Sequence, residues 1–439
     1  MRPAPVSACL AALVLGVVPP APASAASAAS TVALAPRAAG QSVDEFYAAR
    51  GQQPLWLRQG QEESARQLLR YFETAKADGL NPKRYRTREI AQALRNAWGG
   101  SPAAVQRADR LLSQAFVAYV QDLRRAPNVG VIYVDAELRP QAPSARALLD
   151  AVAAAPSVPA YVAQMGWMHP YYGQYRQLLV RGDVDGSRRA LVQLNMERAR
   201  SLPASGRYVL VNAAAQRLFM VDNGRTVDMM RVVVGKPHQP TPMMAALIRY
   251  TSLNPYWNVP ADLAAERVAP FVVKSGVGYL RQKGYQLLSD WTDRARPVNP
   301  ATIDWKAVAD GRKEVRLRQL PGPSNSMGDM KFMFPNAQGI YLHDTPSTEL
   351  FSEASRMFSG GCVRLEAAHR LATWLHGKPL RARGAKPEQK VDLPTPVPVY
   401  LTYLTAVPSG TELAYYEDIY GRDAQRLARM RGGREVAAR

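Results

Sequence analysis

The chain has 439 residues, of which 47% are hydrophobic and 21% charged, so it is long enough for two or three domains with real cores. Its formal net charge of +20 fits either a solubility feature or attraction to an anionic surface, such as a membrane or a cell-wall polymer. The sequence has no zinc-finger spacing and no basic motif interleaved with aromatic residues, which argues against a nucleic-acid-binding protein.

The first residues have the three parts of a secretory signal peptide. Arg2 supplies the positive charge, residues 8–18 form a short apolar run, and the small residues Ala23 and Ala25 make a cleavage site. The apolar run is too short to span a bilayer, and no other segment of the sequence is long and apolar enough to do so. We therefore predict a signal peptide over residues 1–25 and export to the periplasm.

Two different compositions follow the predicted cleavage site. Residues 26–41 are rich in alanine and other small residues, which is typical of a disordered linker. Residues 42–204 favour helices, because Ser42 provides an N-cap and Ser101-Pro102 is a usual helix start. Between these caps, apolar residues recur at helical spacing at Ala65, Leu68, Leu69, Phe72 and Ala75. We predict a helical scaffold domain over 42–204.

The pattern changes to strands at about residue 205. The runs on either side of Asn223-Gly224 are β-branched, and this dipeptide is a strong signal for a type I′ hairpin. Further strand-like runs occur at 247–259, 339–344 and 398–407. They enclose a less regular stretch, residues 260–320, with short helical pieces and turns. This arrangement predicts a mostly β domain with an inserted lid.

The domain organisation that we predict is therefore α+β and multidomain. A helical scaffold is followed by a mostly β domain over 205–423, in which residues 260–320 form the lid. A basic tail follows over 424–439, and we expect its last ten residues to fray.

The sequence contains two cysteines, Cys9 and Cys362. Cleavage of the signal peptide removes Cys9, so the mature protein can form neither an intramolecular disulfide nor a multi-thiolate metal site. An unpaired thiol in an exported protein is open to oxidation, so Cys362 calls for a functional reason. We expect no metal and no cofactor.

The residues around Cys362 offer the parts that thiol catalysis needs. His343 ends a predicted strand and could deprotonate the thiol. Gly360 and Gly361 allow a sharp turn that brings backbone amides close to a substrate carbonyl. Residues 363–377 have the pattern of a helix, which would put Cys362 near a helix N-terminus, where the dipole lowers a thiol pKa.

Arg364 adds a positive charge beside this thiol. Each of these residues also has an ordinary structural interpretation. A lone cysteine is most often a buried inert residue, a lone histidine in a strand is usually structural, and two glycines can simply make a turn. Their combination in an exported protein favours a cysteine acyl-transfer enzyme, a description that papain-like and sortase-like hydrolases share.

The stretch from Tyr341 to Arg364, YLHDTPSTELFSEASRMFSGGCVR, resembles the catalytic signature of the YkuD-type L,D-transpeptidases, in which a histidine precedes a Ser/Thr-x-Gly-Cys motif. It is most similar to the large periplasmic YcbB-like branch, which has YLHDTP, FS-x-GC and an arginine. Further similar stretches are VVVGKP (232–237), NPYWNVP (254–260), LPGPSNSMGDMKFMFPN (320–336) and YEDIYGRD (416–423). The resemblance covers 206–423 well and the N-terminal half more loosely, through FYAARGQQPLW (46–56) and ADGLNPKRY (77–85).

The sequence departs from the common family pattern in the motif and in its domain content. Where the common motif has a histidine before Gly-Cys and an asparagine after it, this chain has Gly360 and Arg364. Arg364 agrees with the large branch, whereas Gly360 is expected to loosen the loop or alter the substrate fit. The branch often carries a peptidoglycan-binding module before its catalytic domain, and residues 175–200 leave no room for it.

The resemblance implies an enzyme that cross-links the cell wall without a cofactor. Cys362 would attack the carbonyl between the third residue and the terminal D-alanine of a peptidoglycan tetrapeptide stem, with His343 as the base. The amine of a second stem would resolve the thioester into a 3→3 cross-link, and carbapenems would acylate the same thiol. The backbone amides of Gly361 and Cys362, with Gly360 and the Tyr341 hydroxyl, would form the oxyanion hole.

The resemblance also suggests which residues contact the substrate. We expect these to be Ser359, Arg364, Trp257 and Asp344, although core packing is the commoner role for a tryptophan such as Trp257. Asp344 follows His343 along a strand and therefore points to the opposite face. The group that orients His343 is accordingly expected to be a backbone carbonyl, from residue 344 or from the region of Ser359.

Three alternatives stay open at this point. The same fold could act as an L,D-carboxypeptidase, with water as the acceptor, or could attach a lipoprotein to the wall. A third possibility, from another class, is a non-catalytic peptidoglycan-binding protein in which Cys362 is a relic. The presence of both His343 and Cys362 argues against this third alternative.

Overall fold

The computed structural model describes residues 36–437. The predicted signal peptide over 1–25 lies outside the described residues, as does most of the predicted linker. Helix α1 begins at Pro36, so the last residues of the predicted linker, 36–41, are helical. Within the described range, no helix combines the length and apolarity that crossing a membrane requires.

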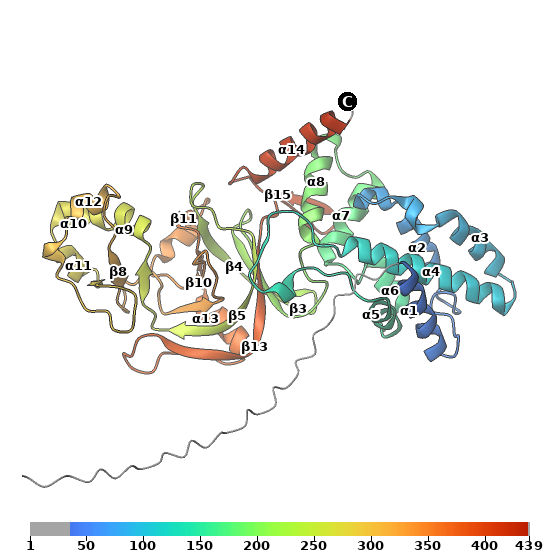
Figure 1. Cartoon of the computed structure of the whole chain (residues 1–439), viewed down its shortest axis with the longest axis horizontal. Coiled ribbons are helices and arrows are strands. Elements are labelled where there is room, and N and C mark those ends of the chain that lie inside the picture. Colours follow the sequence, from blue (N-terminus) through green and yellow to red (C-terminus); the bar gives the residue numbers. More distant parts are fainter. Residues whose placement is uncertain (1–35, 438–439) are drawn as a thin grey trace, which may run out of the picture.

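The N-terminal part is helical, as predicted, and packs around a hydrophobic core of its own (Figure 1). Ser101 begins the longest helix, because its Oγ accepts a hydrogen bond from the Ala104 amide at 3.3 Å and Pro102 follows it. The α-helices of this scaffold are α1 (Pro36–Ala49), α2 (Glu62–Glu73), α3 (Thr87–Ala97), α4 (Pro102–Leu123), α5 (Ala145–Ala153), α6 (Val158–Ala163), α7 (Pro170–Arg181) and α8 (Gly186–Ala199). Short 3₁₀ turns lie at Ala75–Asp78, Pro82–Tyr85 and Ala136–Leu138.

The following part is a β-sheet that closes on itself. The strands run in the order β5-β13-β2-β3-β4-β12-β10-β9, and β9 pairs again with β5. Their bounds are β2 (Tyr208–Asn212), β3 (Arg217–Asp222), β4 (Arg225–Gly235), β5 (Met244–Leu253), β9 (Met330–Met333), β10 (Leu342–His343), β12 (Val363–Leu365) and β13 (Gln389–Thr402). The inward faces of these strands, with helix α13 (Ala368–His376), make the second hydrophobic core.

The predicted hairpin at Asn223-Gly224 is confirmed. β3 and β4 are antiparallel and pair Asp222 with Arg225 across the turn. Asn223 has φ 48° and Gly224 has φ 76°, so both central residues are left-handed, as a type I′ turn requires.

Smaller elements extend the sheet. β1 (Ile132–Tyr133), which lies between α4 and α5 of the scaffold, pairs with β5, and β11 (Met357–Ser359) pairs with β4. β14 (Ala406–Ser409) and β15 (Glu412–Tyr415) form a separate hairpin near the scaffold. A one-turn 3₁₀ helix lies at Thr348–Ser352.

The inserted lid is a small body with its own core, at the left of Figure 1. Its sheet has the order β6-β8-β7, formed by β6 (Trp257–Val259), β7 (Tyr285–Leu288) and β8 (Arg316–Gln319). Its helices are α9 (Ala261–Arg267), α10 (Ala269–Ser275), α11 (Gly278–Gln282) and α12 (Trp305–Ala309), with a 3₁₀ turn at Pro300–Thr302. The structural lid therefore begins with Trp257, slightly before the predicted boundary at residue 260.

The scaffold and the β domain meet through a mixed apolar and polar contact. A fourth buried cluster contains Leu202, Tyr208, Leu210, Tyr400 and Leu404. Beside it, Asn195 of α8 donates to the Thr405 hydroxyl at 3.1 Å and accepts from the Thr405 amide at 2.9 Å. The predicted basic tail is largely helical: α14 (Arg422–Ala437) packs against α8, and its backbone stays helical almost to the end of the chain.

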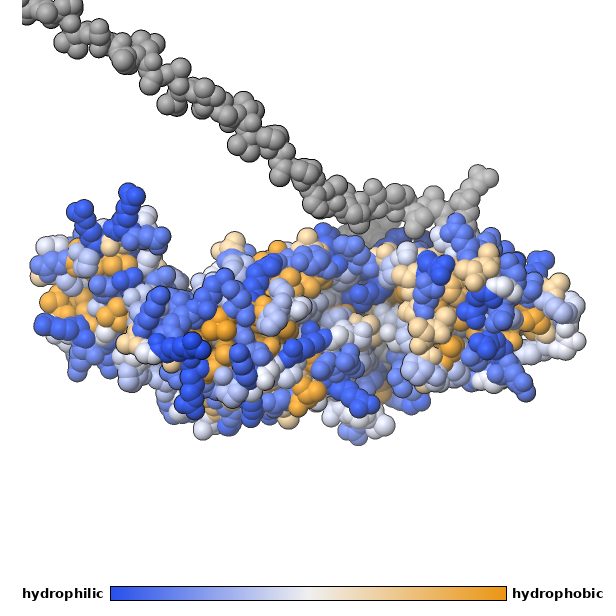
Figure 2. Space-filling view, turned by 90° about the horizontal axis from the view of Figure 1, so that it is seen from below, coloured by the Kyte–Doolittle hydropathy of each residue, from blue (hydrophilic) through white to orange (hydrophobic). Residues whose placement is uncertain are grey.

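The surface is mostly polar on the face seen in Figure 2. Hydrophobic patches are scattered across this face and are separated by hydrophilic side chains, which fits the excess of basic residues in the sequence.

Candidate active site

The pairing of β10 with β12 brings the predicted catalytic residues to one face. These strands are parallel, with Leu342 opposite Val363 and His343 opposite Arg364. Leu342 and Val363 both point into the barrel core. Because side chains alternate along a strand, His343 and Arg364 point away from this core, and Cys362, one residue before Val363, shares their face. His343 is then the diagonal neighbour of Cys362, a position within reach of a ring side chain.

His343 is buried and held by its own strand end. Its Nδ1 lies 2.6 Å from the backbone carbonyl oxygen of Asp344. A carbonyl only accepts hydrogen bonds, so Nδ1 carries the proton and Nε2 is left as an acceptor. The residue-344 carbonyl thus orients the ring, as predicted. Burial, followed by the charge of Arg364, lowers the pKa of His343 to about 3, so the ring is neutral.

Cys362 lies between β11 and β12 and is partly exposed. Its Sγ is 3.5 Å from the carbonyl oxygen of Gly339. Burial raises the pKa of the thiol to about 11, and a backbone hydrogen bond from Tyr341 together with the charge of Arg364 opposes this only in part. The resting pair is therefore a neutral thiol beside a neutral imidazole.

The predicted helix start at Cys362 is wrong. Residues 363–365 form β12, which pairs with β4 on one side and β10 on the other, and the helix begins only at Ala368. Pairing within the sheet overrides the helical pattern of the sequence. The dipole of α13 therefore does not activate the thiol, in agreement with its raised pKa.

The loop before the thiol is held by Ser359. Its hydroxyl donates to the Cys362 carbonyl at 2.5 Å and accepts from the Gly361 amide at 3.1 Å. Gly361 has φ 109°, a conformation that favours glycine. The Gly361 amide is thus already bound in this structure, so its predicted role as an oxyanion donor would require it to leave the Ser359 hydroxyl. The amides of Gly360 and Cys362 have no hydrogen-bond partner among the described residues.

Two polar side chains beside the loop keep unused hydrogen-bonding capacity. Arg364 is half-buried, its Nε has no partner in the described part of the chain, and it takes part in none of the ion pairs found there. The Oε1 of Gln239 is buried and unpartnered as well, while its Nε2 donates to Asp262 of the lid at 3.1 Å. Gln239 was missed in the sequence, where only the neighbouring VVVGKP stretch pointed to this turn.

The lid reaches the loop at Gly360. A Cβ atom added at this glycine would lie 3.1 Å from Cδ1 of Leu263 in α9, closer than most such contacts. Arg267 of α9 donates to the Phe358 carbonyl at 3.3 Å, and Lys236 pairs with Glu266 at 2.7 Å. A larger side chain at position 360, such as the histidine of the common motif, would require Leu263 to move.

Three further predicted residues are Tyr341, Trp257 and Asp344, and only the first lies beside the thiol. Tyr341 precedes His343 on the same strand face and lies close enough to Cys362 for a thiolate to raise the pKa of its hydroxyl, an effect second to burial. Trp257 lies in β6, opposite Gln319, and packs on the lid core. The Asp344 carboxylate points to the other side of β10, where it accepts from the Asp329 amide at 2.9 Å. The structure does not bring Asp344 to the site.

A cluster of possible metal ligands lies on that other side. Oxygen or nitrogen atoms of Asp329, Asp344 and His369 lie within 4.8 Å of one another, and His369 Nε2 is 3.2 Å from Asp329. Exposed carboxylates of this kind are common without an ion. The cluster faces away from Cys362 and offers it no chemistry.

The C-terminal YEDIYGRD stretch supports the catalytic loop from behind. The Tyr420 hydroxyl donates to the Gly235 carbonyl at 2.8 Å, and Arg422 Nη2 donates to the Thr241 carbonyl at 2.8 Å. The Thr241 hydroxyl in turn donates to the Gly361 carbonyl at 2.8 Å. These contacts tie the end of the chain to the residue before Cys362. No local sequence spacing could have predicted them.

Comparison with known proteins gives the same two-part division. Residues 41–179 match the model of the Scaffold domain family, and residues 206–399 match the model of the YkuD family, described as the L,D-transpeptidase catalytic domain. The chain is 29% identical over 392 residues to a Haemophilus influenzae protein described as "Putative L,D-transpeptidase", covering 87% of this chain and 78% of that protein.

One solved structure also aligns with the chain. It is that of Bd1075 from Bdellovibrio bacteriovorus, at 14% identity and a TM-score of 0.18, over 52% of this chain and 55% of the other. A likeness at this score carries no argument about the fold or the site.

Proposed function

The chain belongs to the L,D-transpeptidase family through its YkuD-type catalytic domain, and from this premise we propose that it forms 3→3 peptidoglycan cross-links through an acyl-enzyme at Cys362. One observation carries the proposal. Cys362 and His343 share a face of two paired strands, and the Asp344 carbonyl fixes the His343 ring so that Nε2 is the free basic nitrogen.

The first half-reaction consumes a tetrapeptide stem. The Cys362 sulfur attacks the carbonyl carbon between the third residue and the terminal D-alanine, while His343 Nε2 takes the thiol proton. The sulfur–carbon bond forms, the carbon–nitrogen bond breaks, and the proton passes to the amine of the leaving D-alanine. Because the thiol pKa is about 11 and the imidazole pKa is about 3, we propose that the proton moves during the attack and not before it.

The oxyanion of the tetrahedral intermediate needs donors that are free in the resting enzyme. The Cys362 and Gly360 amides fit this need, because neither has a partner among the residues that the structure describes. The Gly361 amide could join them only after leaving the Ser359 hydroxyl. A single well-aimed donor of this kind is worth about 10²–10³ in rate.

Arg364 and Gln239 are the residues that we propose for binding the donor stem. The stem carries carboxylate and amide groups, and Arg364 offers an unpaired guanidinium for the first while Gln239 offers a free carbonyl oxygen for the second. The lid would close over the stem through α9, which already contacts the loop at Gly360.

In the second half-reaction the side-chain amine of another stem attacks the thioester and gives the 3→3 link. The thioester conserves the energy of the broken peptide bond, so no nucleotide is needed in the periplasm, where we propose that the enzyme works. Water in place of the amine would make the enzyme an L,D-carboxypeptidase, and a lipoprotein amine would attach that lipoprotein to the wall. We also propose that carbapenems acylate Cys362, since their strained amide presents the same carbonyl chemistry.

Purified disaccharide-tetrapeptides test the proposal directly. The mature protein and its Cys362→Ala variant are incubated with them, and the products are separated and identified by mass spectrometry. Dimers with 3→3 links and release of D-alanine, both lost in the variant, support a transpeptidase. Tripeptides alone indicate a carboxypeptidase. Unchanged substrate would contradict catalysis and favour a wall-binding protein.

A further inference from the structure

A basic pocket lies where the scaffold meets the C-terminal helix, away from the thiol. It has a volume of about 320 Å³ and is bounded by α8, the segment 128–130, residues 242–243 and α14. Four arginines line it, Arg198 from α8 and Arg422, Arg426 and Arg429 from α14, together with Asn128 and Gln425. None of the described residues that line the pocket is acidic.

The arginines of α14 that line the pocket lie on one side of that helix. Arg422, Arg426 and Arg429 stand four and three residues apart, so their side chains follow one side of the helix. This side faces α8, which packs against α14. The chain thus gathers like charges between two helices, an arrangement that costs free energy unless an anion offsets it.

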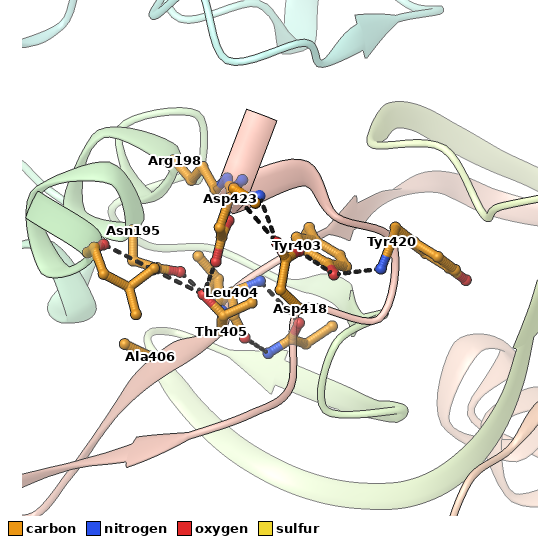
Figure 3. A network of polar contacts seen from close by, with 12 residues as sticks. Asn195, Arg198, Tyr403, Leu404, Thr405, Ala406, Asp418, Tyr420 and Asp423 are labelled. Carbon is orange, nitrogen blue, oxygen red and sulfur yellow. Dashed lines mark hydrogen bonds and ion pairs between the residues drawn. The ribbon is translucent and has the colours of Figure 1, made fainter. Parts of the chain in front are cut away.

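Charge balance in the pocket is incomplete. Arg198 is 3% exposed and pairs with Asp423 at 2.5 Å, a contact drawn in Figure 3. Arg422, Arg426 and Arg429 take part in none of the ion pairs found within residues 42–430. Asp423 is itself engaged by the Thr405 hydroxyl. Asp423, which pairs with Arg198, and Asp418, whose charge acts on Arg422 without forming an ion pair, are thus the two carboxylates that face four guanidinium groups.

The guanidinium of Arg422 is held by its neighbours and still has one nitrogen without a hydrogen-bond partner in the described part of the chain. Its guanidinium lies 5.0 Å from the Tyr403 ring and 4.9 Å from the Tyr420 ring, and its Nη2 donates to the Thr241 carbonyl. Its Nη1 is buried and has no hydrogen-bond partner in the described part of the chain. Burial first, and later the charge of Arg198, lowers the pKa of Arg422, so the two guanidinium groups are close enough to repel. An anion between them would remove this repulsion.

We propose that this pocket binds a phosphate-class oxyanion, that is, a phosphomonoester or phosphodiester group. A carboxylate has two oxygens and one charge, and a single arginine fork satisfies it. Three arginines of one helix have no ion-pair partner among the described residues, although Arg422 and Arg426 each donate to a backbone carbonyl. Together with a fourth arginine from α8, they suit a tetrahedral group with more oxygens and more charge. The pocket has room for such a group, since its volume is roughly ten times the ~30 Å³ share of one water molecule in the liquid.

Calorimetric titration with inorganic phosphate and with pyrophosphate tests this site on the whole mature protein. The informative variant is Arg426→Gln with Arg429→Gln, because both side chains are at least partly exposed and their loss leaves Arg198 and Arg422 in place. The matched control is Arg88→Gln with Arg95→Gln, which removes the same charge from exposed positions on α3. We expect saturable binding that becomes about tenfold weaker in the pocket variant and stays unchanged in the control.

Vesicles distinguish the two sources of such a group. Sedimentation with phosphatidylglycerol vesicles, compared with phosphatidylcholine vesicles, asks whether the phosphate belongs to a lipid. Binding to the anionic vesicles that the pocket variant loses supports the site with a lipid headgroup as ligand, whereas phosphate binding without vesicle binding supports it with a soluble ligand. The proposal is overturned if the wild type binds neither probe, or if the pocket variant and the control weaken binding equally, because the effect is then only that of net charge.

Discussion

The buried carboxylate of Asp109 in the scaffold differs from the polar groups at the thiol site in how far the fold satisfies it with hydrogen bonds. In the scaffold, Asp109 is fully buried and accepts hydrogen bonds from the amides of Leu55, Trp56 and Leu57 at 2.7, 2.8 and 2.9 Å, and from the Tyr47 hydroxyl. Its capacity is used up by the fold. Such a group holds the entry segment of the scaffold against α4 and offers nothing to a ligand.

At the thiol site, the fold leaves several hydrogen-bond donors and acceptors without partners. His343 Nε2 has no bond to the protein in the described part of the chain, and neither have Arg364 Nε, Gln239 Oε1 and the Cys362 amide. A buried polar atom without a partner is costly, and two of them, Arg364 Nε and Gln239 Oε1, lie beside this thiol, while others such as Trp167 Nε1 lie in the scaffold. The comparison sets Asp109, which serves the fold, against the groups for which we propose a role toward substrate, and the changes below test this distinction.

Removal of the thiol should have the largest effect. We expect Cys362→Ala to lower the transpeptidation rate at least about 10³-fold, because no other nucleophile replaces the sulfur. Since the side chain is small and partly exposed, the free energy of unfolding should change by less than about 1 kcal/mol. Product analysis and denaturant unfolding measure the two quantities. If the loss of activity matched the fraction of the variant that is unfolded, Cys362 would be a residue that stabilises the fold, as Asp109 does.

His343→Gln should lower the rate by about 10²–10⁴-fold, since it removes the base while keeping a polar side chain of similar size. The matched control is His376→Gln on α13, where the histidine hydrogen-bonds Thr251 at 2.9 Å and faces no substrate. Initial rates with a tetrapeptide donor measure both. Similar losses in the two variants would mean that His343 acts only through structure.

Asp109→Ala should cost stability and spare the chemistry. It leaves three buried amides without their acceptor and removes one partner of the Tyr47 hydroxyl, which keeps Ser113, so we expect the free energy of unfolding to fall by about 3–5 kcal/mol. The rate per folded molecule should stay the same. The control Asp150→Ala removes an exposed partner of Arg146 and should cost less than about 1 kcal/mol. If the folded Asp109→Ala variant were less active than the folded wild type, Asp109 would not be a purely structural residue.

Substitution of His169 should have the smallest effect, and this effect should appear in the pH dependence of the free energy of unfolding. Its Nδ1 accepts from the Tyr171 amide at 3.1 Å, its Nε2 lies 3.0 Å from the Tyr208 hydroxyl, and burial lowers its pKa to about 3. The proton therefore binds the unfolded chain better, so the stabilisation is complete above the ordinary pKa of 6.5 and is lost as the pH falls from there toward 3.

His169→Gln removes this titration. On going from about pH 7 to about pH 5, the variant should lose about 2 kcal/mol less stability than the wild type, as urea unfolding at both pH values will measure. Its activity at neutral pH should match that of the wild type. Equal pH dependence in both proteins would show that His169 is protonated in the folded state.

Local signals in the sequence were sufficient for several elements. The Ser101-Pro102 helix start and the Asn223-Gly224 hairpin depend on neighbouring residues only, and both occur as predicted. The aromatic residues Trp167, Tyr172 and Tyr175, which lie close together in the sequence, are buried in the scaffold core.

Contacts between distant segments could not be predicted in the same way. The strand after Cys362 exists because β4 and β10 flank it, and a helical apolar pattern could not reveal that pairing. The link from Arg422 through Thr241 to Gly361 joins residues far apart in the chain. The unused hydrogen bonds that mark the site are likewise a property of the folded chain, because partners are lost or gained only when the segments meet.

The identity of the acylated residue tests the central claim most directly. The protein is mixed with a tetrapeptide donor in the absence of acceptor, quenched with acid, digested and mapped by mass spectrometry. The account predicts a tripeptide acyl group, formed with loss of D-alanine, on the peptide that contains Cys362. Cross-linked product without any adduct at Cys362, or an adduct on another residue, would contradict it.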